Sequence, residues 1–201
     1  MSLEPHYKVS IIAPCYNEIY FIEDFIKNIY DQELKSIDLN IIIADGDSND
    51  GTRNKLDQLK GRYDNLFIIN NSERIVSTGL NKAMLLSNSD ILIRMDIHTI
   101  YDKFYINNCV HELIKNKADN IGGAWRSSES SNFIQTCINN SFKSKIGTGG
   151  AKAKNYHYDG EVDTVYLGCW WRKNLIAIGG FDENFVRNQD DELCLRMKKL
   201  G

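Results

Sequence analysis

The first half of the chain alternates short apolar runs with amphipathic segments. Runs rich in β-branched residues predict strands at residues 9–13, 39–44, 66–70 and 91–95. Between them, apolar residues recur three and four positions apart, which predicts helices over 19–29, from near 52, and over 78–87. Strands that alternate with helices, with almost no hairpin signals, favour a mainly parallel sheet covered on both faces. The predicted fold class is therefore α/β.

The second half of the chain is less regular. Residues 121–125 and 162–167 predict two further strands, and residues 190–200 predict a last helix. A stretch rich in Ser, Asn, Lys and Gly separates these strands. Because long polar loops in compact domains are commonly functional or mobile, residues 143–158 are expected to be both.

Length and composition narrow the class of protein. A chain of 201 residues fits one domain, predicted over residues 4–201. Residues 1–3 look like a cloning remnant, and the abrupt end after a helical pattern predicts that the natural protein continues. The formal net charge of -3 shows no basic excess, so no nucleic-acid partner is expected.

The cysteines and the apolar runs bear on location. The five cysteines form no C-x-x-C pair, which favours neither a zinc knuckle nor a disulfide framework. No run approaches the roughly 20 apolar residues of a membrane span, and the start lacks a secretory pattern. A cytoplasmic location is the prediction.

Acidic side chains follow three of the predicted strands. They lie in Pro14-Cys15-Tyr16-Asn17-Glu18, in residues 45–52 and in Asp96-Ile97-His98. The carboxyl ends of parallel strands meet at one edge of a sheet, where ligands of this fold class bind. Carboxylates that converge there repel one another unless a cation is supplied. A divalent metal is the expected partner.

Asp96 and His98 are the candidate metal ligands. Two positions apart on an extended segment, they point to the same side. An oxygen and an imidazole nitrogen together shift the preference from Mg²⁺ toward Mn²⁺. Taken alone, however, the pattern also fits an aspartate that caps a turn and a histidine that packs beside Tyr101.

Two further acidic segments have both a functional and a structural interpretation. Asp45, at the start of a segment dense in turn formers, either accepts hydrogen bonds from a nucleoside or merely caps the next helix. Asp190 and Asp191 open the last helix, where acids complement the helix dipole, but three consecutive acids exceed what a cap requires. One of them is therefore a candidate general base. No Gly-rich phosphate loop is present, so a metal is expected to hold the phosphates.

Taken together, five segments resemble the family 2 glycosyltransferases of GT-A fold. The family order is P-x-Y-N-E, a D-G-x-S-x-D-G-T turn, a D-x-D-like metal motif, G-G-F-D-E and an acidic helix start. Here the order reads residues 14–18, 45–52, 96–98, 179–183 and 189–193. Residues 94–99, 168–172 and 186–192 most resemble the succinoglycan-type exopolysaccharide glucosyltransferases.

The resemblance implies a role for each matching residue. Asp45 would take the N–H of uracil, Asp190 would be the base with Asp191 as the fallback, and His98 replaces the second acid of the metal motif, beside Asp96. Trp170 and Trp171 would stack on the acceptor sugar, although a core role is the alternative. The residues implied for nucleotide binding are Pro14, Tyr16, Glu18, Asp45, Asn81, Lys82 and Asp96.

The activity implied is inverting transfer of a sugar from a nucleoside diphosphate, in particular UDP, to a saccharide hydroxyl in polysaccharide biosynthesis. The cofactor would be Mn²⁺ or Mg²⁺. The acceptor would be a saccharide, lipid-linked at the cytoplasmic face of the inner membrane, with any membrane association through parts absent from this chain. Two alternatives stay open: a nucleotidyltransferase, and a non-catalytic domain that binds nucleotide sugars.

Overall fold

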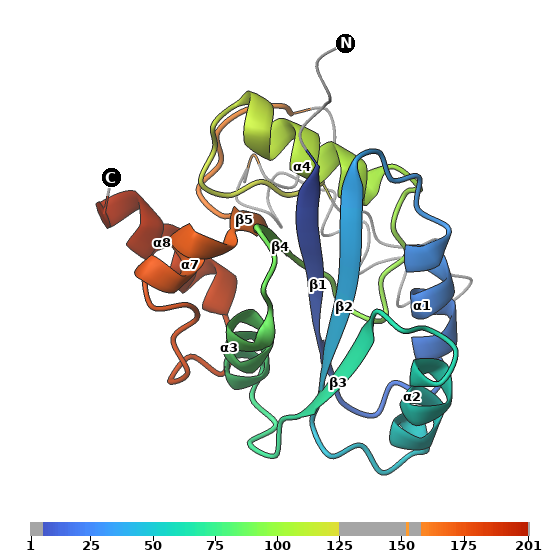
Figure 1. Ribbon diagram of the computed structural model, residues 1–201. Coiled ribbons are helices and arrows are strands. Elements are labelled where there is room, and N and C mark those ends of the chain that lie inside the picture. Colours follow the sequence, from blue (N-terminus) through green and yellow to red (C-terminus); the bar gives the residue numbers. More distant parts are fainter. Residues whose placement is uncertain (1–5, 125–151, 153–157, 201) are drawn as a thin grey trace, which may run out of the picture.

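A five-stranded sheet forms the centre of the computed structural model, which describes residues 6–124, 152 and 158–200 (Figure 1). The strand order is β3-β2-β1-β4-β5. β1 pairs in parallel with both β2 and β4, and β5 alone runs antiparallel. The strands are β1 (Tyr7–Cys15), β2 (Ile37–Asp45), β3 (Leu66–Asn70), β4 (Ile91–Arg94) and β5 (Cys169–Trp171).

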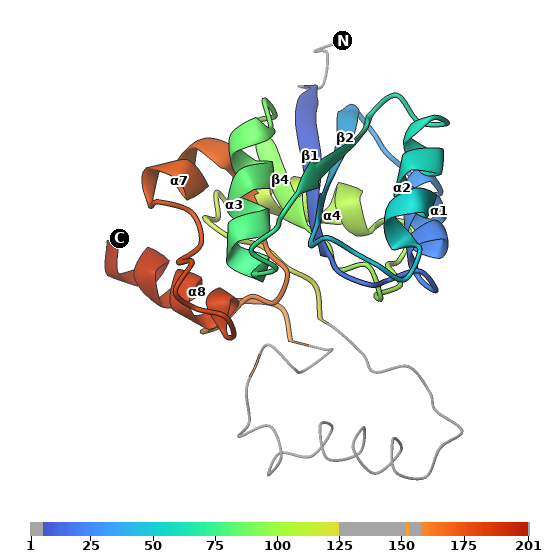
Figure 2. The same ribbon diagram turned by 90° about the horizontal axis from the view of Figure 1, so that it is seen from below.

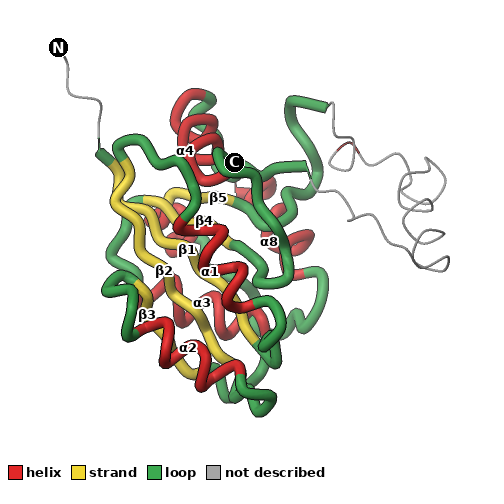
Figure 3. The backbone as a smooth tube through the Cα atoms, turned by 90° about the vertical axis from the view of Figure 1, so that its right-hand side faces the viewer, coloured by secondary structure: helices red, strands yellow, loops and turns green. Residues whose placement is uncertain are grey.

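Helices cover both faces of this sheet, as Figures 2 and 3 show. α1, α2 and α4 pack on one face, and α3, α7 and α8 pack on the other. None of these described helices combines the length and the apolar content that crossing a membrane requires. The helices are α1 (Ile22–Tyr30), α2 (Thr52–Lys60), α3 (Val76–Leu86), α4 (Tyr105–Lys115), α7 (Arg172–Ala177) and α8 (Gln189–Leu200).

The core has two layers because successive strand residues point to opposite faces. On β1, Ile11 packs with α1, α2 and α4, whereas its neighbour Ile12 packs with α3, α7 and α8. Both side chains are fully buried. A strand that is buried on both faces reads as a continuous apolar run, which is why these strands are evident in the sequence.

The predicted parallel α/β architecture is confirmed, and several details differ. α4 was not predicted, although its buried residues Ile106, Cys109, Val110 and Leu113 recur at helical spacing. The strand predicted at 162–167 is wrong: Leu167 has a φ of 59°, which no strand accommodates, and β5 begins at residue 169. Of residues 121–125, Ile121 forms only an isolated bridge with Cys169. Residues 1–3, 125 and nearly all of 143–158 lie outside the described residues.

Gly79 lets α3 approach the loop that follows β3. A Cβ at this position would lie 2.8 Å from Asn71 Nδ2 and 3.0 Å from the Cβ of Ala44. Asn71 in turn ties its own loop together, because Nδ2 donates to the Ile75 carbonyl and Oδ1 accepts from Thr78 Oγ1, both at 2.8 Å. An added methyl therefore displaces the loop that Asn71 holds.

Gly79→Ala is expected to destabilise the protein by about 1–3 kcal/mol, as overpacking typically does. Urea denaturation measures the change. Gly61→Ala is the matched control: Gly61 has a φ of -69°, and its added Cβ would come no closer than 3.5 Å to another atom. This control should be neutral or stabilise by about 0.4–1 kcal/mol. Equal effects of the two variants would contradict the close approach at Gly79.

Candidate functional site

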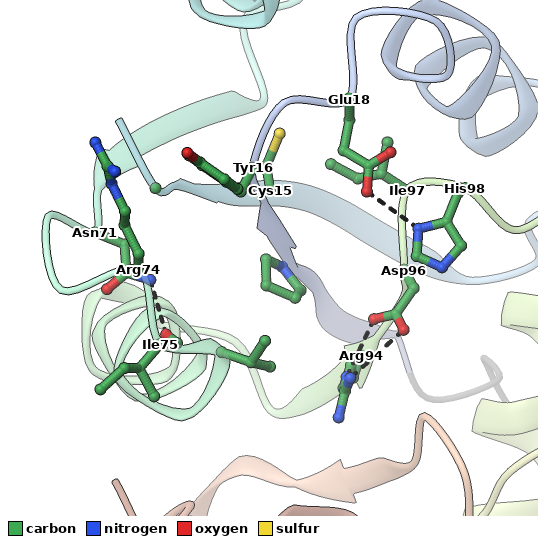
Figure 4. A pocket seen from close by; sticks show the side chains of 13 residues that line it. Cys15, Tyr16, Glu18, Asn71, Arg74, Ile75, Arg94, Asp96, Ile97 and His98 are labelled. Atoms are coloured by element: carbon green, nitrogen blue, oxygen red, sulfur yellow. Dashed lines mark hydrogen bonds and ion pairs between the residues drawn. The ribbon is translucent and has the colours of Figure 1, made fainter. Parts of the chain in front are cut away.

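The ends of β1, β2 and β4 surround a cavity of about 180 Å³ at the carboxyl edge of the sheet (Figure 4). Parallel pairing produces this convergence, since Cys15 at the end of β1 lies in register with Asp45 at the end of β2. The lining residues come from four separate segments, which are Pro14, Cys15, Tyr16 and Glu18; Gly46; Asn71, Arg74, Ile75 and Val76; and Arg94, Asp96, Ile97 and His98.

One wall of the cavity is aromatic and cationic. The Arg74 guanidinium carbon lies 5.2 Å from the centre of the Tyr16 ring. Arg74 has a φ of 57°, and the hydrogen bonds of Asn71 hold the backbone around it. Tyr16 is 46% exposed, so much of its ring remains available to a planar ligand. This wall suits a nucleobase stacked on the ring, with the guanidinium beside it.

A second wall pairs Glu18 with His98. The Nδ1 atom of His98 lies 3.1 Å from Oε1 of Glu18, and Figure 4 shows this contact between the two side chains. Contact with a carboxylate assigns the proton of a neutral imidazole to Nδ1. The other nitrogen, Nε2, is then left with a free lone pair.

Arg94, at the end of β4, joins two acids that are distant in sequence. Its Nη1 donates to Oδ1 of Asp190 at 2.7 Å, and its Nε donates to Oδ1 of Asp96 at 3.3 Å. A third contact runs from Nη2 to Oδ2 of Asp96 at 3.5 Å. Arg94 is 4% exposed, so these charges meet in an environment that screens them weakly.

Burial and charge oppose each other at Asp190. Burial raises the pKa of the Asp190 carboxyl, and the neighbouring Arg94 guanidinium acts in the opposite direction. At Arg94, burial alone would lower the pKa, but the Asp96 and Asp190 carboxylates outweigh it and raise the pKa. Arg94 is therefore a permanent cation between two acids.

Asp45 lies directly behind the lining. Its side chain is buried, and Oδ1 accepts from Ser48 Oγ at 2.6 Å. Oδ2 lies 3.5 Å from Nη1 of Arg53. The neighbouring Gly46 lines the cavity itself. Asp45, the acid predicted to bind the nucleobase, thus lies next to the cavity. Both of its carboxylate oxygens already contact hydrogen-bond donors.

The residues at this edge can hold a divalent ion only in part. Asp96 offers carboxylate oxygen and His98 offers Nε2, with Glu18 orienting the ring as carboxylates commonly orient metal-binding histidines. Within residues 6–124, 152 and 158–200, no three His, Cys, Asp or Glu side chains gather as a metal cluster. The donor chemistry therefore fits a metal for which the protein supplies two ligands and a bound diphosphate with water supplies the rest.

The structure brings most of the predicted site residues together. Pro14, Tyr16, Glu18, Asp96 and His98 all line the cavity. Asp190 joins them through Arg94, whereas Asp191 is exposed on the next position of α8.

Four predicted residues, Asn81, Lys82, Trp170 and Trp171, lie away from the cavity at the strand ends. Asn81 is buried against the loop after α7, where Nδ2 donates to the Phe181 carbonyl at 2.8 Å, and Lys82 pairs with Glu73 at 2.5 Å. Neither lines the cavity at the strand ends.

The two tryptophans, predicted to stack on the acceptor sugar or else to lie in the core, do not line the cavity either. Trp170 is 1% exposed and packs edge-on against Phe181, so it is a core residue and offers no face to a sugar. Trp171 packs against Tyr7 with ring centres 5.9 Å apart. It pairs with Ile91 at the amino end of β4, which is the opposite edge of the sheet from the cavity.

Two arginines of the site were not predicted. Arg94 occupies the last position of a buried strand, and a charged residue inside an otherwise apolar run is the signal that marks it. Arg74 follows β3 in a polar turn, and nothing in its local pattern separates it from an ordinary loop residue.

Comparison with known proteins shows related chains. Succinoglycan biosynthesis protein ExoA of Rhizobium meliloti (strain 1021) is 32% identical over 193 residues, which cover 95% of this chain and 58% of that protein. The chain therefore spans about three fifths of this relative's length.

Solved structures share the fold. A mannosyltransferase from Pyrobaculum calidifontis, PcManGT, solved in complex with GDP-Man and Mn²⁺, superposes with a TM-score of 0.71 at 18% identity. The alignment covers 99% of this chain and 54% of that one. Residues 1–349 of TarS from S. aureus, in complex with UDP, superpose with a TM-score of 0.68 at 14% identity, covering 94% of this chain and 54% of that one. These neighbours confirm the GT-A fold.

The family described as Glycosyl transferase family 2 matches residues 10–171, from β1 to the end of β5. That span includes every residue lining the cavity at the strand ends. This match and the identity to the exopolysaccharide protein both identify the family of this chain. The chain belongs to glycosyl transferase family 2 and is close to its exopolysaccharide-type members.

Proposed function

We propose that the protein transfers a sugar from a nucleoside diphosphate, UDP in the first instance, to a saccharide hydroxyl with inversion at the anomeric carbon. One observation carries the proposal. Arg94 links Asp190, a carboxylate on α8 that is only 13% exposed, to Asp96 at the edge of a cavity that offers an aromatic ring and a metal-ligand pair. Such a transfer needs a general base, a site for the nucleotide and a site for the diphosphate.

The donor is assigned to the cavity by its two walls. The nucleobase of the donor lies against Tyr16 with Arg74 beside it, and the diphosphate lies toward Asp96 and His98. A divalent metal held by Asp96 and His98 would supply positive charge to the departing diphosphate. The structural neighbours named above were solved with GDP-Man and Mn²⁺ and with UDP, which supports this class of donor.

Asp190 is proposed as the general base. It takes the proton of the acceptor hydroxyl while that oxygen attacks the anomeric carbon from the side opposite the diphosphate. The new oxygen–carbon bond forms as the carbon–oxygen bond to phosphate breaks, and the diphosphate leaves with the bonding electron pair. One displacement inverts the configuration at that carbon. A lipid-linked saccharide at the cytoplasmic membrane face is the proposed acceptor.

Asp190→Asn should lower kcat by about 100- to 10,000-fold, the usual contribution of general-base assistance. Release of the nucleoside diphosphate measures kcat, and calorimetry should show donor affinity close to the wild-type value. Asp191→Asn is the matched control, because Asp191 is the exposed neighbour on the same helix. Collapse of the Asp191 variant with normal turnover of the Asp190 variant would transfer the role to Asp191.

Tyr16→Ala should weaken nucleotide binding by roughly 5- to 150-fold, because stacking of a base on an aromatic ring contributes about 1–3 kcal/mol. Titration calorimetry with UDP gives the change. Tyr20→Ala removes a ring that is 88% exposed and absent from the cavity lining. Binding should be unchanged in this control, and equal losses in both variants would argue against the Tyr16 wall.

Thermal melting with UDP-, GDP- and dTDP-sugars, each with and without Mn²⁺, identifies the donor. A ligand at about 100 times its Kd should raise the melting temperature by about 5–10 °C. His98→Ala should remove the part of the rise that depends on Mn²⁺. His111→Ala is the control, since His111 lies 3.0 Å from Glu112 in the same kind of pair on α4.

The melting experiment, together with an assay of sugar transfer and donor hydrolysis, also separates transfer from binding alone. A rise that Mn²⁺ does not alter in the wild-type protein would remove the metal from the proposal. Binding of a sugar nucleotide without any transfer or hydrolysis would favour a domain that binds nucleotide sugars and does not catalyse.

A further inference from the structure

We infer that Arg94 is a positioning residue for the transfer reaction: its guanidinium fixes the Asp190 carboxylate against the edge of the donor cavity. The inference rests on the proposed role of Asp190 as the base. Arg94 itself touches neither reacting oxygen in this scheme, and it acts through the carboxylate that it holds.

The contact geometry is specific for a guanidinium. One face of the fork, Nε and Nη2, meets the two oxygens of Asp96 at 3.3 and 3.5 Å, and the remaining nitrogen, Nη1, meets Asp190 at 2.7 Å. Figure 4 shows the contacts between Arg94 and Asp96 at the floor of the cavity. A lysine ammonium is a point charge on a flexible stem and cannot keep this fork.

Asp190 has little other reason to turn toward the sheet edge, where it meets Arg94. It opens α8, and an acid at a helix N-terminus is satisfied equally well in solvent, as Asp191 is one residue later. The Asp190 side chain is instead 13% exposed, against a guanidinium that is 5% exposed. The bond to Arg94 offsets part of the loss of solvent around this carboxylate.

The helix itself is anchored independently of Arg94. Leu193 of α8 is fully buried in the layer formed with α3 and α7. Nη2 of Arg196 donates to the Gly180 carbonyl and to Glu192, at 2.8 and 2.7 Å. Removing the Arg94 fork should therefore release the Asp190 carboxylate and leave α8 in place. This separation distinguishes a positioning role from a general structural one.

The ion pair between Glu192 and Arg196 lies within α8, whereas Arg94 links α8 to the sheet. Their ion pair spans one turn of α8 and faces the loop after α7, not the donor cavity. Arg94, by contrast, contacts Asp96 at the sheet edge and also Asp190 of α8, which lies 96 positions further along the sequence than Arg94. A shift of the helix start relative to β4 would therefore show first at this contact.

The test is a mutant cycle between Arg94 and Asp190 in the purified protein. Arg94→Lys should lower kcat by roughly 100-fold, the cost of displacing a catalytic group by about 1 Å. Because Arg94 acts through Asp190, the double variant with Asp190→Asn should be no slower than Asp190→Asn alone. Arg172→Lys is the matched control: Arg172 Nε donates to the Met84 carbonyl at 3.1 Å away from the cavity, and kcat should not change.

The inference is overturned if Arg94→Lys turns over normally, or if the two losses multiply in the double variant. Arg94→Gln and circular dichroism guard against misfolding: two Arg94 variants that both lose their helical signal would mean that Arg94 is structural, which also overturns it. Normal turnover of Asp190→Asn, by contrast, would refute the proposed base and leave Arg94 without its partner. The two failures are therefore distinguishable.

Discussion

Charge balance at the carboxyl edge of the sheet is the constraint on which the site depends. Asp96 and Asp190 both lose most of their contact with solvent, and two carboxylates so placed repel each other. Arg94 supplies a permanent positive charge between them, which leaves these three groups with one net negative charge. That residual charge suits an edge where a divalent cation and a diphosphate meet, because the cation offsets both.

Most of the fold follows from the alternation of apolar runs. Strands buried on both faces, such as β1, are continuous in sequence, and amphipathic helices such as α1 repeat at a period close to 3.6. β5 could not be found this way. It has three residues, and its direction against β4 depends on a turn at Leu167 that composition does not reveal. Its tryptophans suggested a sugar-binding surface, whereas packing takes Trp170 into the core.

The site was predictable where chemistry and strand ends coincide. Tyr16, Glu18, Asp96 and His98 directly follow buried strands, and parallel pairing brings such positions to one edge. Asn81 and Arg94 were harder for opposite reasons. Asn81 carries a polar group that the fold uses to hold the Phe181 loop, and Arg94 carries a charge within an apolar strand. Only tertiary contacts show which polar groups are already satisfied and which face the cavity.

A crystal structure with a UDP-sugar and Mn²⁺ tests the central claim most directly. The nucleobase is expected against Tyr16, with an anomalous manganese peak between the Asp96 carboxylate and the diphosphate. The Asp190 carboxylate would still be bonded to Arg94 and would face the anomeric carbon. A nucleotide bound instead at another cavity, which Asn81, Gly179 and Arg196 line, would contradict this proposal. So would a manganese ion with no ligand from Asp96.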